Sequence, residues 1–117
     1  MKTHKDLDAW KESIDSVKFV YQETGSFPKE DHFLLVNQIR RSAVSIASNI
    51  TEGAGRNSKK EFIQYLYFTL RSVSELETQL VISENLNYIT NNELFIKIEV
   101  ERKLILGLIR YLKQKSL

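Results

Sequence analysis

Cysteine is absent from the sequence, so the chain can form neither a disulfide framework nor a thiolate metal site. Long hydrophobic runs are absent as well. The longest of them, residues 33–36 and 104–109, are far shorter than the ~20 residues needed to cross a bilayer. The amino terminus lacks the apolar region of a secretory signal. We therefore expect a cytoplasmic protein without a membrane-bound segment.

Strand-like alternation of polar and apolar residues is also missing, as are internal repeats and low-complexity tracts. A length of 117 residues suits one domain that can bury a core without help. The hydrophobic fraction of 42% and the charged fraction of 27% are ordinary for a globular protein and argue against disorder. We expect a single domain over residues 1–117.

Hydrophobic residues recur at steps of three and four, which predicts amphipathic helices. Interruptions at residues 24–26, 54–57 and 85–88 divide the pattern into four. A residue that commonly starts helices precedes each of the four segments: Thr3 or Asp6, Pro28, Ser58 and Thr90. Ser58 and Thr90 each stand three residues before a glutamate, which is the pattern of a capping box. Short connections force neighbouring helices to run antiparallel, so we predict an all-α, up-down-up-down four-helix bundle.

Each predicted helix carries an apolar stripe that we expect to be buried. The stripes are Leu7, Trp10, Ile14, Val17 and Tyr21; Val36, Ile39, Ala43, Ile46 and Ile50; Phe62, Leu66, Thr69, Val73, Leu76 and Leu80; and Leu94, Ile98, Ile105, Leu108 and Leu112. Glu101 interrupts the last one, and Gly107 lies inside the same helix. Gly53 and Gly55 are expected to close the second helix in the left-handed conformation, and Asn87 the third.

Apolar residues of the third helix extend beyond its stripe to Tyr65, Tyr67, Phe68 and Leu70. A helix that is apolar on more than one side needs more than one neighbour. We therefore expect the bundle to associate with copies of itself.

Catalytic and metal-binding patterns are not found. Neither His4 nor His32 has a glutamate three residues before it, as a di-iron bundle would require. The serines at 42, 45 and 48 have no histidine in their segment to activate them. We expect no catalytic residue, no metal ligand and no cofactor, and hence a protein that is not an enzyme.

Small and polar residues border the stripe of the second helix. They are Gln38, Ser42, Ser45, Asn49 and Glu52. At such a margin, polar groups usually hydrogen-bond a backbone amide or a facing helix, so we favour a structural role for Gln38, Asn49 and Glu52. The alternative is that Asn49 and Glu52 form a pair that faces a ligand.

Basic residues gather around the second connection. The segment from residue 38 to residue 60 contains five basic residues and one acidic residue, Glu52. The basic residues are Arg40, Arg41, Arg56, Lys59 and Lys60, and Arg71 is the next basic residue after them. Two interpretations stay open: an ordinary solvated or ion-paired surface, and a patch that binds backbone phosphates. Tyr65 and Tyr67 lie nearby in sequence and could stack on bases or belong to the core.

Four segments together resemble the family of four-helix-bundle proteins encoded by intervening sequences in bacterial 23S rRNA genes, and they span nearly the whole chain. They are Asp6–Trp10, Phe27-Pro28 with Glu30, Gln38–Gly53 and Ser72–Glu77. A similar bundle is the accessory protein of diversity-generating retroelements. The resemblance implies an antiparallel bundle that assembles into a ring, commonly a pentamer. It also implies a basic surface that, in the retroelement branch, contacts nucleic acid and a reverse transcriptase. Arg71 stands where the family pattern usually has a small residue.

Our leading hypothesis from the sequence is a homo-oligomer that binds RNA, or another nucleic acid, through the basic residues. RNA is favoured by the resemblance alone. The alternative is a ring that acts as a structural adaptor and binds a protein partner, such as a polymerase, through the same face.

Overall fold

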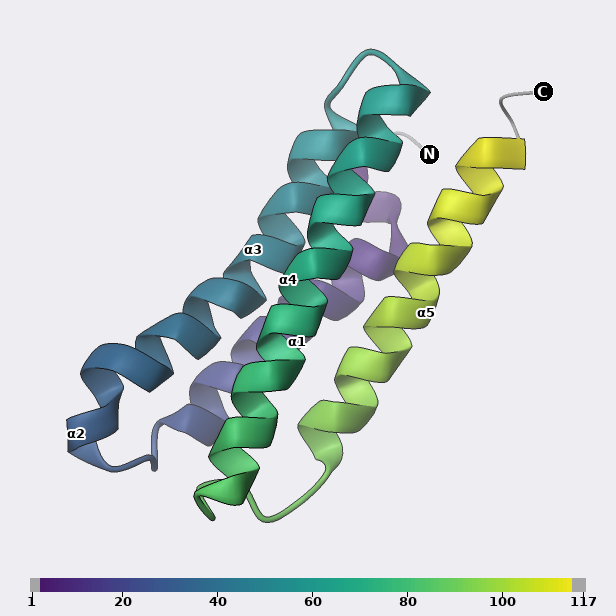
Figure 1. The fold of residues 1–117 in the computed structure, drawn as a ribbon. Coiled ribbons are helices and arrows are strands. Elements are labelled where there is room, and N and C mark those ends of the chain that lie inside the picture. The colour runs from purple at the N-terminus through teal and green to yellow at the C-terminus, as the bar shows by residue number, and fades with distance from the viewer. Residues whose placement is uncertain (1–2, 115–117) are drawn as a thin grey trace.

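The structure, a computed structural model, describes residues 3–114 and is built from helices, with no strand in that range. Figure 1 shows the four long helices, which confirm the predicted helical class. In chain order the elements are η1 (His4–Asp6), α1 (Asp8–Thr24), α2 (Lys29–Asp31), the π-helical segment η2 (His32–Val36), α3 (Asn37–Ala54), α4 (Lys59–Asn85) and α5 (Glu93–Gln114).

The long helices pack side by side as an elongated bundle that measures 50 × 22 × 20 Å along its principal axes. α3 packs against both α1 and α4, and α5 packs against both α1 and α4. α2, η2 and α3 follow one another without a break, so the predicted second helix is present but contains one π-helical turn. None of the helices over residues 3–114 is both long and apolar enough to cross a membrane.

Two of the predicted helix-end signals are confirmed. The Ser58 side chain accepts a hydrogen bond from the backbone N–H of Glu61 (3.1 Å), which caps α4. Asn87 closes the same helix with a φ of 63°. The predicted cap at Thr90 is wrong, because α5 begins only at Glu93, and the side chain of Asn91 accepts from the backbone N–H of Glu93 (3.1 Å).

The glycines do not have the predicted role at the end of α3, because neither Gly53 nor Gly55 has a positive φ. Gly55 follows α3 with a φ of −83°. Gly53 is buried inside the last turn, where α3 lies very close to α4. A Cβ atom at Gly53 would lie 2.7 Å from the Cβ of Tyr65 and 3.0 Å from Cδ1 of Phe62. This glycine is therefore required for the close approach of two helices and not for left-handed backbone.

The predicted stripes of the second and third helices are confirmed, since every residue in them is buried. In α5 the prediction is nearly right. Leu94, Ile98, Ile105 and Leu112 are buried, but Ile109 takes the buried place that was predicted for Leu108, which is only half-buried.

The predicted core face of the first helix is right only in part, because Leu7, Trp10 and Val17 are half-buried against the core and none of the five predicted residues is fully buried. The buried residues of α1 are Ala9, Ser13, Ser16, Val20 and Thr24. Ile14 and Tyr21 from the predicted stripe are each 45% exposed. Short side chains let α3 and α5 pack close to α1. The hydroxyls of Ser13 and Thr24 are satisfied within α1, since they donate to the backbone carbonyls of Trp10 (2.6 Å) and Val20 (2.7 Å).

Glu101, which interrupts the predicted stripe of α5, is fully buried in the core. Among the residues that the structure describes, neither of its carboxylate oxygens has a hydrogen-bond partner of ordinary geometry, and the same is true of the nearby Ser16 hydroxyl. Burial raises the pKa of Glu101 from 4.5 to about 7. The carboxylates of Glu12 and Asp15 add to this increase, whereas the Ser16 hydroxyl and the Lys97 ammonium oppose it.

Candidate nucleic-acid interface

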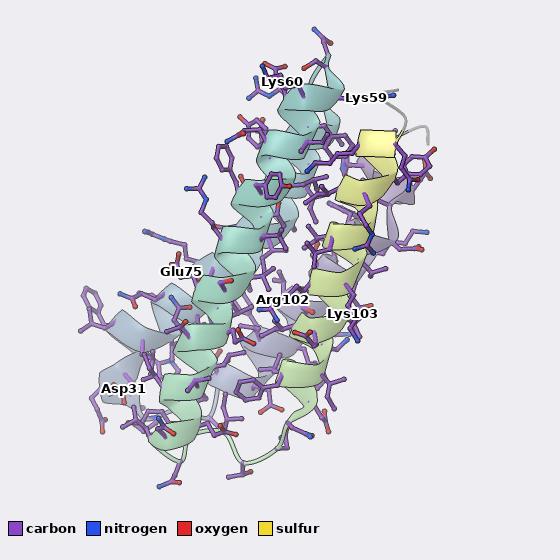
Figure 2. The ribbon with its side chains drawn as sticks, turned by 45° about the vertical axis from the view of Figure 1, so that its right-hand side comes forward. Asp31, Lys59, Lys60, Glu75, Arg102 and Lys103 are labelled. Atoms are coloured by element: carbon purple, nitrogen blue, oxygen red, sulfur yellow. The ribbon has the colours of Figure 1, made fainter. Side chains whose placement is uncertain are left out.

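The six predicted basic residues lie along α3 and the first half of α4 and do not form one compact cluster. Arg40 and Arg41 are in the first turns of α3, whereas Arg56 lies beyond its other end. Thirteen residues of α3 follow Arg41, about 20 Å of helix at 1.5 Å per residue, and Arg56 lies beyond them. Figure 2 shows Lys59 and Lys60 together at one end of the molecule, at the start of α4.

Arg71 lies between these two groups. Gly53 at the end of α3 lies against Tyr65, and Ser42 near its start donates to Glu75 Oε1 (3.3 Å). Arg71 is between Tyr65 and Glu75 along α4, so it is level with the middle of α3. The six basic residues, which we call the basic residues of the α3–α4 side, are thus spread along these two helices from one end to the other.

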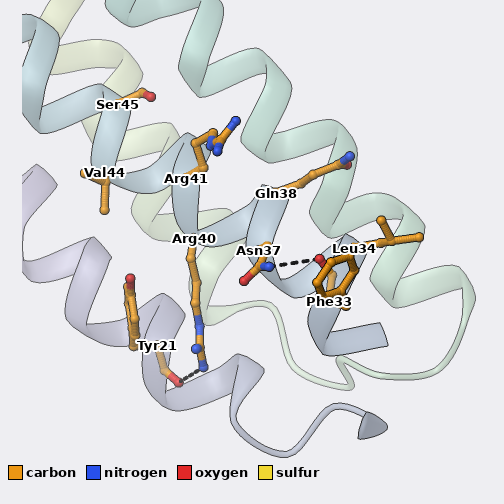
Figure 3. A pocket seen from close by; sticks show the side chains of 9 residues that line it. All are labelled: Tyr21, Phe33, Leu34, Asn37, Gln38, Arg40, Arg41, Val44 and Ser45. Atoms are coloured by element: carbon orange, nitrogen blue, oxygen red, sulfur yellow. Dashed lines mark hydrogen bonds between the residues drawn. The ribbon is translucent and has the colours of Figure 1, made fainter. Parts of the chain in front are cut away.

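Arg40 is held by α1 without any carboxylate. Its Nε donates to Thr24 Oγ1 (3.0 Å), and its Nη2 donates to the carbonyl oxygen of Tyr21 (3.5 Å). The guanidinium carbon lies 4.4 Å from the centroid of the Tyr21 ring. Figure 3 shows Arg40 extended toward Tyr21, whereas Arg41 leaves α3 in another direction. Arg41 is exposed, and no ion pair or hydrogen bond joins it to residues 3–114.

The other two arginines of this side are also placed over aromatic rings. Arg71 lies 4.6 Å from the centroid of Phe68, and Arg56 lies 4.8 Å from the centroid of Tyr65. Arg56 also has a carboxylate neighbour, Glu52, at 3.8 Å. Both members of that pair are well exposed, and such surface pairs contribute little.

Two cations of α5 have different surroundings. Lys97 forms ion pairs with Glu12 (3.3 Å) and Asp15 of α1, and this pairing raises the pKa of Lys97. Arg102 pairs with Glu77 of α4 (3.0 Å) and with Glu99. These positive charges are neutralised within the chain. The arginines of the α3–α4 side keep most of theirs.

The polar stripe of α3 divides into buried and exposed members. Ser42 is buried and bridges to α4 through Glu75. Gln38 and Glu52 are exposed, and Asn49 is half-buried. The Asn49 side chain makes no hydrogen bond to any residue in the described part of the chain. The hydrogen bonds on which a structural role for Asn49 would depend are therefore not supplied by residues 3–114.

An open hollow of about 600 Å³ lies over the start of α3 (Figure 3). Its lining residues are Tyr21, Phe33, Leu34, Asn37, Gln38, Arg40, Arg41, Val44 and Ser45. Phe33 is 80% exposed and Leu34 is 65% exposed, both on η2. The sequence analysis missed both Tyr21 and Phe33 as members of a site. Phe33 belongs to a short apolar run, but nothing in that run shows which of its residues face solvent.

Over residues 3–114, no cluster of three or more histidine, aspartate or glutamate side chains is placed to hold a metal ion. A family model described as 23S rRNA-intervening sequence protein matches residues 5–109. The chain therefore belongs to that family, as its four sequence segments predicted. No curated protein matches the chain.

Proposed function

We propose that this member of the 23S rRNA-intervening sequence protein family is a self-associating, non-enzymatic protein of the cytoplasm that binds RNA through the arginines of the α3–α4 side. The observation that carries the proposal is how those arginines are held. Arg40, Arg56 and Arg71 lie over the rings of Tyr21, Tyr65 and Phe68, and neither Arg40 nor Arg71 has a carboxylate partner among the described residues.

Stacking on a ring suits a guanidinium for phosphate binding. The ring occupies the flat face of the group and leaves the N–H donors at its edge for phosphate oxygens. Arg71 keeps all of these donors, since no hydrogen bond joins it to residues 3–114. Arg40 and Arg56 keep only part of theirs, because Arg40 donates to α1 and Arg56 donates to the Tyr65 hydroxyl. A side chain that is already held in place also loses less conformational freedom when it binds. Unpaired positive charges near a polyanion release counterions from it, which is the main source of sequence-independent affinity.

RNA is the polyanion we favour, because the family description ties its members to intervening sequences of 23S rRNA. No cofactor or metal is part of the proposal. Binding requires only the side chains already in place.

The architecture we propose is an antiparallel up-down-up-down bundle. The pairing along α3 and α4 supports it, because Gly53 and Ser42 of α3 meet Tyr65 and Glu75 of α4 in reverse order. The short connection at residues 55–58 has the same implication.

An RNA titration tests the proposed surface. We expect the variant Arg41→Glu/Lys60→Glu/Arg71→Glu to bind a mixed RNA at least roughly 10-fold more weakly than the wild type at low salt. Its plot of log affinity against log salt concentration should also be shallower by about 2, since three phosphate contacts are lost. Arg40 is left unchanged because its bonds to α1 make it part of the fold.

The matched control reverses three lysines away from this side, Lys11→Glu/Lys18→Glu/Lys103→Glu, with the same change in net charge. It should keep more of the affinity than the first variant. If both variants lost RNA affinity equally, binding would depend only on the net charge of the protein, which would contradict a defined binding surface. Both variants must first show the oligomeric mass and helix content of the wild type.

The exposed part of the predicted core face of α1 supports self-association. Ile14 is exposed, and with Trp10, Val17, Val44 and Ala47 it lines an apolar groove of about 390 Å³ between α1 and α3. An apolar helix face that its own bundle leaves uncovered marks an interaction surface.

We expect Ile14→Glu/Val44→Glu to lower the oligomeric mass measured by light scattering, whereas Ile96→Glu/Val100→Glu on α5 should preserve it. A wild type that has the mass of a single chain at every concentration would contradict self-association. Retention of mass by the groove variant would exclude the groove as the contact.

The alternative function, an adaptor ring that binds a protein such as a polymerase, has one specific observation in its favour: Phe33 and Leu34 are large, apolar and exposed beside the arginines. If the protein is such an adaptor, it should show no salt-dependent binding to RNA. The wild type should retain a protein partner, and variants that carry Arg41→Glu should lose it.

A further inference from the structure

We propose that the hollow at the start of α3 is a subsite for one unpaired base of single-stranded RNA, with Phe33 as the stacking surface and Arg40 and Arg41 beside the neighbouring phosphates. This inference rests on the proposed RNA-binding function and makes it specific for unpaired strands.

Phe33 has the exposure that base stacking needs. With 80% of its surface accessible, it is the most exposed of the large hydrophobic side chains in residues 3–114. The π-helical segment η2 presents it, and Asn37 Nδ2 donates to the carbonyl oxygen of Phe33 (2.9 Å), which fixes the wide turn. Single π-helical turns inside α-helices are frequent at functional sites.

Two guanidinium groups that can contact phosphate line the same hollow as this ring. Arg40 and Arg41 both line the hollow, and neither has a carboxylate partner in the described chain. The lining residues of η2 and α3 run from Phe33 to Ser45, twelve steps along the helix and roughly 18 Å at the α-helical rise. Gln38 and Ser45 line the same hollow and can hydrogen-bond the edge of a base or a ribose hydroxyl.

The chemistry of the hollow favours a base over the apolar core of a protein interface. Its large apolar side chains are few, and two arginines and two amides lie among them. A stable protein interface covers about 800 Å² on each partner and has an apolar centre depleted of charge. Duplex RNA fits less well, because its bases are stacked on one another and are not available to Phe33.

The experiment compares Phe33→Ala with the wild type on a short oligouridine and on a short RNA duplex. We expect Phe33→Ala to bind oligouridine roughly 5- to 150-fold more weakly, the range for loss of one base stack, and to bind the duplex unchanged. Phe33→Tyr should keep the wild-type affinity for oligouridine, because its ring also stacks. Ile96→Ala removes another exposed side chain, on α5, and should change neither affinity.

The other outcomes decide against the inference in distinguishable ways. Wild-type affinity of Phe33→Ala for oligouridine, with intact salt-dependent binding, would overturn the base subsite and leave the proposed function standing. Equal weakening on oligouridine and duplex would also overturn it. A lower oligomeric mass of Phe33→Ala would assign Phe33 to a contact between copies. No binding of either RNA by the wild type would reject the function and the subsite together.

Discussion

Replacement of Glu101 by glutamine is expected to stabilise the protein at about pH 8 by up to about 3 kcal/mol, although the change removes a charge and adds no contact. Glu101 is fully buried, and its carboxylate oxygens lack hydrogen-bond partners within residues 3–114. Burial of such a group penalises the charged form. Glutamine keeps the shape of the side chain and carries no charge at any pH.

The pH dependence follows from the direction of the shift. The pKa of Glu101 is raised from 4.5 to about 7 by folding, so the folded state holds this proton more tightly than the unfolded state. The stability that this group contributes is complete below pH 4.5, is lost as the pH rises through about 7, and does not change further at higher pH. The wild type should therefore lose stability across this range, and Glu101→Gln should lose less.

Urea unfolding followed by circular dichroism, at several pH values between about 4.5 and 8, measures the difference. The two proteins should be close in stability at the acidic end and should diverge at the alkaline end. Glu84→Gln, at an exposed position of α4, is the control and should follow the wild type throughout. Parallel curves for Glu101→Gln and the wild type would contradict a buried carboxyl with a raised pKa.

Substitution of Gly53 by alanine is expected to lower the free energy of unfolding by about 1–2 kcal/mol, or roughly 4–8 °C in melting temperature for each kcal/mol. Alanine is normally the better helix former by about 1 kcal/mol. Here the new methyl group would lie 2.7 Å from Tyr65 Cβ, an atom that no side-chain rotation can move away. α3 and α4 would have to separate, and packing would be lost along their contact.

Gly107→Ala is the matched control, because Gly107 also lies inside a helix but faces open space. The nearest atom to a Cβ there is Arg110 Nη2, at 3.9 Å, so no neighbouring backbone in this chain requires the glycine. Gly107→Ala should raise the melting temperature through helix propensity alone. Thermal unfolding of both variants tests whether their melting temperatures change in opposite directions. A higher melting temperature for both would show that α3 and α4 can move apart at little cost.

Every residue of the stripes that hydrophobic spacing predicted for α3 and α4 is buried, although spacing did not identify buried residues beside them, such as Ala47, Gln79 and Ser83. For α1 it was wrong in part, because Ile14 and Tyr21 are exposed and the rest of the predicted stripe is only half-buried against the core. The buried positions of α1 include Ser13, Ser16 and Thr24. Hydrophobicity ranks the faces of a helix but does not say which one its own bundle covers. A serine or threonine that satisfies its hydroxyl on its own backbone can enter a core at low cost.

The candidate site was predictable in charge but not in geometry. The sequence showed a group of arginines, and the structure adds that Tyr21, Tyr65 and Phe68 hold three of them. Such pairs join different helices or successive turns, so they depend on the packing register. The exposure of Phe33 follows from a π-helical turn, which the three-and-four spacing of an α-helix does not contain.

The same π-helical turn sets a limit on how the chain length can vary. Each α-helical residue turns the chain by about 100°, so the count of residues in η2 sets the angle between α3 and the segment before it. That segment contains Asp31, whose carboxylate accepts a hydrogen bond from the Tyr88 hydroxyl near the end of α4. A one-residue deletion in η2 would rotate Asp31 away from Tyr88. A substitution in η2 would leave the number of residues unchanged, and Asp31 would keep its position relative to Tyr88. This part of the chain is therefore more sensitive to insertions and deletions than to exchanges of side chains.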